Sequence, residues 1–305
     1  MKITKSIKNK KSLLLDYFRC RADESISDIQ KKYAANQYAK MASEINKCVK
    51  ESKTNLINSV LQEAAKNNWS KMDRLESLLM ISYCNIVVML ERRNSIRQYE
   101  YMDFSRRVGE LWDSFCKLCF EHPVIDDISL FVPPLFSDVK RQLTREIMQY
   151  IDSLRLTENE KNELKSYYDK VWGLVTSGEV KLELDLHFMK NSNRYVVDFK
   201  SGFGSNEKGN LNRLLLVGSV YKILAEQYYC LLFVRSDENN NYFTTLQNSG
   251  IWEAYSGNET YKKIHEFSGY DLKTWIKNNI DWQNDISTQT VSSFQKNNLL
   301  QYLIW

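Results

Sequence analysis

Glycine and proline are scarce in this chain of 305 residues, which has only 10 glycines and 3 prolines. Gly109 is the only glycine before Gly173, and the prolines are confined to Pro123, Pro133 and Pro134. Both residue types interrupt helices, so their near absence from the first half predicts a region that is almost entirely helical. The later glycines predict turns and a mixed second half. We therefore expect an α+β or α/β fold with a largely helical N-terminal half.

The sequence also lacks a long apolar run. The most apolar stretch, Ile86–Leu90, is bounded by Ser82 and Asn85 on one side and by Glu91–Arg93 on the other, and it is far too short to span a bilayer. We interpret it as part of a buried helix. The lysine-rich N-terminus is not followed by an apolar segment with a small-residue cleavage site, so it does not resemble a signal peptide. We expect a cytoplasmic protein without membrane contact.

Cysteine is rare as well, and six cysteines in a chain of this size do not form a disulfide scaffold. Cys116 and Cys119, followed by His122, resemble half of a zinc site, but no second cysteine pair completes it. The two thiols lie three positions apart beside Phe115 and Phe120. We therefore expect buried thiols in a helix. The net charge of +4 is compatible with a polyanionic partner but does not by itself indicate one.

Apolar residues recur at helical spacing through most of the first half. The segments with this spacing are Ile7–Arg21, Ser25–Ser52, Leu56–Lys66, Met72–Tyr101, Phe104–His122 and Phe136–Leu154. We expect residues 1–155 to form one helical region and residues 156–305 to form a second domain.

Two segments of alternating polarity follow in the second half. Residues 182–188 alternate apolar and polar side chains, which is the period of a strand. Residues 195–200 alternate in the same way and place Asp198 and Lys200 on one face. Turn-forming residues 191–193 lie between the two segments, so we expect an antiparallel hairpin.

The polar face of this hairpin brings Asp185, Asp198 and Lys200 toward one spot. Magnesium prefers oxygen ligands and is commonly held by one or two carboxylates together with phosphate oxygens and water. Asp185 and Asp198 would be the ligands, the main-chain carbonyl of Phe199 could add an oxygen, and Glu183 could replace or assist Asp185. Lys200 would stabilise charge or activate water. The alternative interpretation is a solvated hairpin face with an incidental ion pair.

Twelve residues separate Asp185 from Asp198, and one residue separates Asp198 from Lys200. This spacing resembles the motif of the PD-(D/E)XK nuclease superfamily, which includes most type II restriction endonucleases. Leu184 stands where the family pattern has proline. The resemblance covers roughly residues 157–236 and implies a central mixed sheet flanked by helices, in the order helix, strand, strand, strand, helix, strand. We match this order to a helix opened by the capping box Thr157–Glu160, strands at 171–175, 182–188 and 195–200, a turn at 177–178, a helix at Leu211–Gln227 and a strand at Tyr228–Val234.

The resemblance also implies further site residues. Family members often add an acidic residue from the first helix, for which Glu160 and Glu163 are candidates. The polar, glycine-containing loop at 201–210 follows Lys200 and lets the backbone approach a ligand closely. Side chains suited to phosphates or base edges in and after this loop are Ser201, Asn206, Lys208, Asn210, Asn212 and Arg213.

The resemblance implies a magnesium-dependent endonuclease that hydrolyses phosphodiester bonds in double-stranded DNA, most plausibly a type II restriction endonuclease. The helical region 1–155 would serve target recognition or dimerisation, and residues 156–305 would be catalytic. A palindromic target would be matched by a homodimer, and a cognate methyltransferase would protect the host DNA. The alternatives are a repair, recombination or phage-defence nuclease of the same fold, a non-catalytic nucleic-acid-binding protein, and a helical interaction protein without metal-dependent activity.

Overall fold

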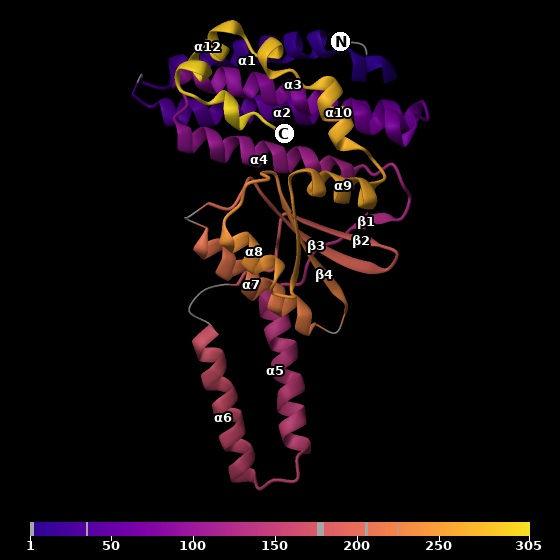
Figure 1. The fold of residues 1–305 in the computed structure, drawn as a ribbon, viewed down its shortest axis with the longest axis vertical. Helices are drawn as coiled ribbons and strands as arrows, with labels where there is room; N and C mark the ends of the chain where they lie inside the picture. The colour runs from indigo at the N-terminus through magenta and orange to yellow at the C-terminus, as the bar shows by residue number, and fades with distance from the viewer. Residues whose placement is uncertain (1–2, 35, 176–179, 205–206, 225) are drawn as a thin grey trace.

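The computed structural model describes residues 3–34, 36–175, 180–204, 207–224 and 226–305. The protein is a mixed α+β structure with a five-stranded sheet. From top to bottom, Figure 1 shows a layer of N-terminal helices, one long helix that crosses above the sheet, the sheet itself with shorter helices beside it, and a projecting helical arm. The layers confirm a mixed fold whose N-terminal part is largely helical.

The N-terminal layer consists of α1 (Lys11–Lys32), α2 (Tyr38–Lys66) and α3 (Lys71–Ile96), preceded by the 3-10 helix η1 (Lys5–Asn9). Every residue at positions 77–91 of α3 is buried. A helix that is buried on all sides lies in the core of its layer, which confirms the interpretation of the apolar run. None of the described helices is long and apolar enough to cross a membrane.

The first helix break lies elsewhere than predicted. The spacing predicted separate helices at Ile7–Arg21, Ser25–Ser52 and Leu56–Lys66, whereas α1 continues through positions 22–24 and α2 through positions 53–55. Instead, the helices are interrupted between Lys32 and Tyr38. No glycine or proline occurs at 53–55, and the buried apolar stripe of α2 continues on both sides of these positions. The polar residues there were wrongly read as a break, because a polar solvent face does not end a helix.

Helix α4 (Tyr101–Glu121) lies between the N-terminal helices and the sheet (Figure 1). It buries side chains toward both neighbours. The ring centroids of Trp112 in α4 and Phe199 in the sheet lie 5.7 Å apart. Cys116 and Cys119 are both fully buried and free, as their apolar neighbours predicted. Helix α4 is therefore the element that joins the two layers.

The sheet has the strand order β1-β2-β3-β4-β5. The first three strands pair antiparallel, and β3, β4 and β5 pair parallel. Asn191 and Ser192 connect β2 to β3 with φ values of 50° and 66°, the left-handed conformation that a two-residue hairpin turn needs. The predicted hairpin is thus confirmed. The strands span Ile128–Leu130, Leu186–Lys190, Asn193–Lys200, Tyr228–Val234 and Trp252–Ser256.

Each face of the sheet packs against different helices. Val197 and Phe199 of β3 join the core that includes α4, whereas Val196 joins a second core with α7. This alternation follows from the pleat of a strand, which sends successive side chains to opposite faces. The sheet therefore separates two apolar layers. The helices that complete these layers are α7 (Lys208–Ile223), α8 (Asn241–Gln247) and α9 (Gly257–Ser268).

Helices α5 (Phe136–Ser153) and α6 (Glu158–Val175) form a hairpin that projects from the sheet (Figure 1). The pair is inserted between β1 and β2 in the chain. The predicted strand at 171–175 is wrong, because α6 continues through these residues. The strand that precedes β2 is instead β1, from the connector between α4 and α5. The predicted turn at 177–178 lies outside the described residues.

The capping box at the start of α6 is present as predicted. The backbone N–H of Thr157 donates to Glu160 Oε2 at 2.8 Å, and the hydroxyl of Thr157 donates to the same oxygen at 2.7 Å. In return, the N–H of Glu160 donates to Thr157 Oγ1 at 3.4 Å. These bonds satisfy groups that a helix N-terminus would otherwise leave to water.

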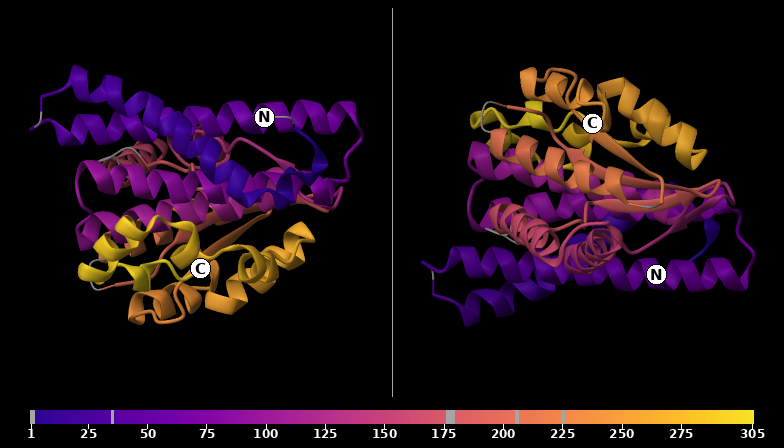
Figure 2. Two further views of the ribbon diagram at one scale, coloured as in Figure 1. Left: turned by 90° about the horizontal axis from the view of Figure 1, so that it is seen from above. Right: turned by 90° about the horizontal axis from the view of Figure 1, so that it is seen from below.

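The C-terminal segment returns to the N-terminal helices. Figure 2, seen from above, shows α3 and α4 between α1–α2 and this segment. The carboxylate of Glu91, which is only 2% exposed, accepts hydrogen bonds from Arg19 and from the backbone N–H of Ser287. Elements of this segment are α10 (Leu272–Asn279), α11 (Trp282–Asp285), α12 (Thr288–Lys296) and η2 (Leu300–Tyr302).

The division at residue 155 stays a prediction, and elements on its two sides pack together. A single apolar core contains residues of the N-terminal helices, of α4, of the sheet and of the C-terminal segment. Strand β1, which belongs to the sheet, also precedes residue 155. The glycine distribution marked a change of secondary structure along the chain, but secondary structure alone does not show which elements pack together.

We predict that Gly218→Ala destabilises the protein whereas Gly209→Ala, in the same helix, does not. A Cβ at position 218 would lie 2.6 Å from Trp252 Nε1 and 2.4 Å from a methyl carbon of Ile251, while a Cβ at 209 meets nothing within 4 Å. Overpacking costs about 1–3 kcal/mol, and alanine in place of glycine gains up to about 1 kcal/mol in a helix. Urea unfolding of both variants measures the difference. Equal stabilities would contradict the tight packing of α7 on β5.

Candidate active site

A carboxylate is buried at the end of strand β3. Asp198 is 2% exposed, and its two oxygens meet cations from different elements. Asp198 Oδ2 lies 2.7 Å from the ammonium of Lys200, two residues further along the strand. Asp198 Oδ1 accepts a hydrogen bond of 2.9 Å from Arg213 of α7. Burying a carboxylate is costly unless nearby cations offset its charge, so these two ion pairs hold the strand end and α7 together.

The second predicted carboxylate lies beside the first. Asp185 immediately precedes β2 instead of lying within it. Its Oδ2 accepts a 2.8 Å hydrogen bond from the backbone N–H of Phe199, the residue after Asp198. Burial and the nearby charge of Asp198 raise the pKa of Asp185. The structure therefore brings Asp185, Asp198 and Lys200 to one place at the ends of two paired strands.

Helix α4 adds a carboxylate and an ammonium group to this cluster. The ammonium of Lys117 lies 2.9 Å from Asp113 Oδ1 and 3.9 Å from Asp185 Oδ1. Burial raises the pKa of Asp113 to about 6, the charges of Asp185 and Asp198 add to this rise, and Lys117 opposes it. Neither residue was predicted from the sequence, because an Asp and a Lys four positions apart on a helix are indistinguishable from an ordinary surface pair.

The segment before β2 is irregular and is held by buried polar groups. The hydroxyl of Tyr221 in α7 donates to the carbonyl of Leu182 at 2.7 Å. The N–H of Leu184 donates to His187 Nε2 at 3.3 Å, and that nitrogen lies 3.4 Å from the Tyr221 hydroxyl. Burial lowers the pKa of His187 to about 4, so the ring is neutral and its Nε2 accepts the bond from Leu184. His187 and Tyr221 thereby set the position from which Asp185 reaches the cluster.

The three acids that the sequence offered as further ligands do not join the cluster. Glu160 accepts hydrogen bonds from Thr157 at the start of α6. Glu183 is exposed, because the buried side chains of Leu182 and Leu184 turn it to the opposite side. Glu163 lies on α6, in the arm that projects away from the sheet (Figure 1), and its Oε1 accepts a 3.3 Å hydrogen bond from the hydroxyl of Tyr167 of the same helix. The first helix of the predicted core was placed on α6, whereas the helix that reaches the carboxylates is α4.

The residues predicted to contact DNA lie in different settings. Ser201 packs closely against Gly109 of α4. A Cβ added at Gly109 would lie 1.9 Å from the hydroxyl oxygen of Ser201. Asn210 donates to Glu207 at 2.6 Å, and Arg213 is engaged by Asp198. Of the described residues in this predicted set, only Lys208 and Asn212, at the start of α7, are exposed. Asn206 lies outside the described residues.

The donor set fits one hard divalent cation. Asp198 Oδ2 is a buried oxygen without hydrogen-bond geometry to any described group, although the ammonium of Lys200 is close. Asp185 Oδ1 lies 3.9 Å from the ammonium of Lys117, and the Asp185 side chain is 33% exposed. Within the described residues, no group of three or more His, Cys, Asp or Glu side chains is arranged to hold a metal. Two carboxylates suffice for Mg²⁺, because it keeps several water or phosphate ligands.

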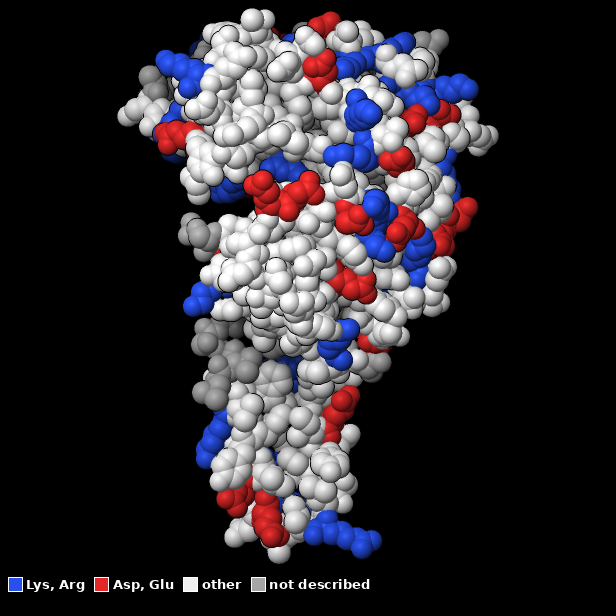
Figure 3. Space-filling view, in the orientation of Figure 1, with Lys and Arg blue, Asp and Glu red and all other residues white. Residues whose placement is uncertain are grey.

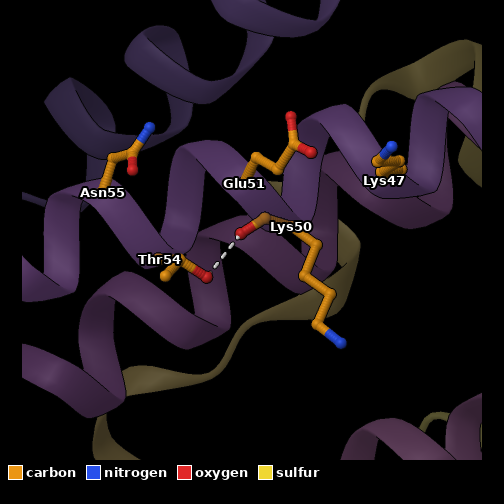
Figure 4. A pocket seen from close by; sticks show the side chains of 5 residues that line it. All are labelled: Lys47, Lys50, Glu51, Thr54 and Asn55. Atoms are coloured by element: carbon orange, nitrogen blue, oxygen red, sulfur yellow. Dashed lines mark hydrogen bonds between the residues drawn. The ribbon is translucent and has the colours of Figure 1, made fainter.

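A surface hollow of about 410 Å³ lies elsewhere, on α2. Figure 4 shows that the side chains around it come from successive turns of this one helix, and that the hydroxyl of Thr54 is bonded to the carbonyl of Lys50 at 3.1 Å. None of these residues belongs to the carboxylate cluster. The hollow is open and has no convergent polar groups, so we assign no site to it. It is lined by Lys47, Lys50, Glu51, Thr54 and Asn55.

Charge on the molecular surface is mixed on the face shown in Figure 3. Lys and Arg side chains alternate there with Asp and Glu, and the area over α7 and α8 carries few charged groups. This face therefore has no continuous basic surface of the kind that follows a nucleic-acid backbone.

Comparison of the chain with protein-family models, with curated proteins and with solved structures finds no match. The chemistry of the cluster must therefore be judged from its own geometry.

We predict that acid destabilises the protein through His187. Its pKa in the folded protein is about 4 against an ordinary value of 6.5. Between these values the unfolded chain binds a proton that the folded chain excludes, so stability that is complete above pH 6.5 is lost as the pH falls toward 4. Between pH 7 and 5 this loss is about 2 kcal/mol. Urea unfolding at both pH values should show a loss that is smaller by about 2 kcal/mol in His187→Phe than in the wild type. The loss does not vanish, because burial also lowers the pKa of His122 to about 4, and His122 is present in both proteins. The same pH dependence in both proteins would contradict it.

Proposed function

We propose that this chain is a magnesium-dependent DNA endonuclease, most plausibly a type II restriction endonuclease, built on a PD-(D/E)XK-type core. The observation that carries the proposal is the convergence of Asp185, Asp198 and Lys200 at one end of the β2–β3 hairpin. Two carboxylates in one partly buried place repel each other, which costs stability unless a cation offsets them. Such a costly arrangement is typical of a functional site.

The order of the elements around the cluster supports this proposal. Helix α4, strands β1, β2 and β3, helix α7 and strand β4 follow one another as helix, strand, strand, strand, helix, strand, with the α5–α6 arm inserted after β1. This is the order that the resemblance implies. The helix that brings an acid to the cluster is then α4, whose Asp113 pairs with Lys117, and not the helix that carries Glu160 and Glu163.

Asp185 and Asp198 would hold Mg²⁺, and the carbonyl of Phe199 could add an oxygen. When bound, the cation would polarise the scissile phosphate and lower the pKa of a water molecule. The ammonium of Lys200 lies beside Asp198, where it would stabilise the negative charge that develops on the phosphate. Arg213 is 40% exposed and would turn from Asp198 to a phosphate of the strand being cut. Hydrolysis would leave a 5′-phosphate, as the resemblance implies.

The partners follow from this activity. Double-stranded DNA would be the substrate, a homodimer would match a palindromic target, and a cognate methyltransferase would protect the host. Alternatively, a repair, recombination or phage-defence nuclease would use the same residues without that methyltransferase. One observation favours a non-catalytic role: three carboxylates of the cluster are matched by the three cations of Lys117, Lys200 and Arg213. A fully paired cluster can also be purely structural.

We predict that Asp198→Asn abolishes magnesium-dependent cleavage of DNA. The amide keeps the shape of the side chain but removes the charge that a divalent cation requires, so the rate should fall by about 100-fold or more. Cleavage of plasmid DNA with Mg²⁺, and with EDTA as the metal-free control, measures this loss.

Glu163→Gln is the matched control, because it also removes one carboxylate but lies on the projecting arm. It should cut DNA at the wild-type rate, and circular dichroism should show that both variants are folded. Wild-type cleavage by Asp198→Asn would remove Asp198 from the site. A wild-type protein that never cuts DNA in Mg²⁺ would favour the non-catalytic role.

We predict that Lys200→Gln separates DNA binding from turnover. If the ammonium acts on the transition state, its loss lowers the rate by about 100–1,000-fold and leaves binding nearly unchanged. Binding is measured in Ca²⁺, which occupies oxygen sites, and turnover in Mg²⁺. An equal loss of binding and turnover would instead make Lys200 an anchor for the phosphate in the ground state.

A further inference from the structure

Lys117 occupies a position between two carboxylates that come from different elements. Its ammonium lies 2.9 Å from Asp113 on α4 and 3.9 Å from Asp185 before β2. Its side chain is only 19% exposed, and the ring of Phe199 lies 5.9 Å from the ammonium. Lys117 is therefore an internal cation and not a surface residue that happens to touch an acid.

The carboxylates on its two sides have few other partners. Asp185 Oδ2 is taken by the backbone N–H of Phe199, which leaves Oδ1 toward Lys117. Asp113 Oδ1 is buried and has no hydrogen-bond geometry to any described group, although Lys117 is close. Two facing carboxylate oxygens are the donors that a hard divalent cation would take. The ammonium stands where such a cation would bind.

The geometry points to Lys117 as a built-in monovalent cation that takes the place of a second divalent cation, so that the site binds one metal ion per chain. This inference rests on the proposed function for the first ion, which would lie between Asp185 and Asp198. A divalent cation between Asp113 and Asp185 would meet the positive charge of Lys117 at contact distance, and like charges repel strongly in a partly buried site. Lys117 would also supply, without a second metal, positive charge close to the reacting phosphate.

The experiment is calorimetric titration with Mn²⁺, which reports stoichiometry without any DNA or turnover. The wild type should bind one Mn²⁺ per chain. In Lys117→Met the new side chain has a similar length but no charge, so this variant should bind two Mn²⁺ per chain. Lys117→Arg keeps the charge and should bind one. The double variant Asp113→Asn with Lys117→Met also lacks a ligand of the second site, so it should bind one Mn²⁺ per chain. Circular dichroism and thermal unfolding show whether each variant is folded.

One Mn²⁺ per chain in folded Lys117→Met, or two in the wild type, would overturn the inference while leaving the proposed function intact. No ion in the wild type and one in Lys117→Met would remove the proposed function but support Lys117 as the occupant of a cation position. No ion in either protein would overturn both.

Should Lys117→Met fail to fold, Asp113→Asn alone still tests the inference. In the wild type Asp113 pairs with Lys117 and does not bind the metal. This variant should therefore still bind one Mn²⁺, with an affinity within about threefold of the wild-type value. Loss of binding in folded Asp113→Asn would mean that Asp113 is itself a ligand and that Lys117 does not hold its place, which overturns the inference.

Discussion

The burial of the Asp198 carboxylate is the constraint on which the centre of this structure depends. At 2% exposure the carboxylate has lost almost all contact with water, and removing a carboxylate from water costs on the order of several kcal/mol. Lys200 from its own strand and Arg213 from α7 offset this cost. Helix α7 must therefore pack with its first turns against the end of β3, and this contact helps to define one side of the candidate site.

Helix α4 defines the other side and links it to the rest of the molecule. The helix buries Trp112 against the sheet and also belongs to the core of the N-terminal layer. From the same helix, Asp113 and Lys117 reach the carboxylates. The C-terminal segment is held to this layer in turn, where Glu91 binds Arg19 and Ser287. The charged cluster is thus supported from both halves of the chain.

Much of the local structure could be predicted because its signals are local. The bounds of β4 were predicted as Tyr228–Val234, since a continuous apolar run between polar residues is typical of a buried strand. The two-residue turn at Asn191 and Ser192 followed from residues that tolerate left-handed backbone. The apolar run at 171–175 was misread as a strand, because a short run has the same composition at the end of a helix.

The sequence by itself determined which residues alternate on β3, and hence that Asp198 and Lys200 share a face, because the two-residue period of a strand is local. It also determined that a hairpin brings Asp185 close to them. Only the tertiary structure decided that Asp113 and Lys117 join this group, since they lie about seventy residues earlier and on an ordinary helix surface. It alone decided that Glu163 points away on an arm. Packing between distant segments follows from how apolar faces fit together, and no periodicity along the chain records that fit.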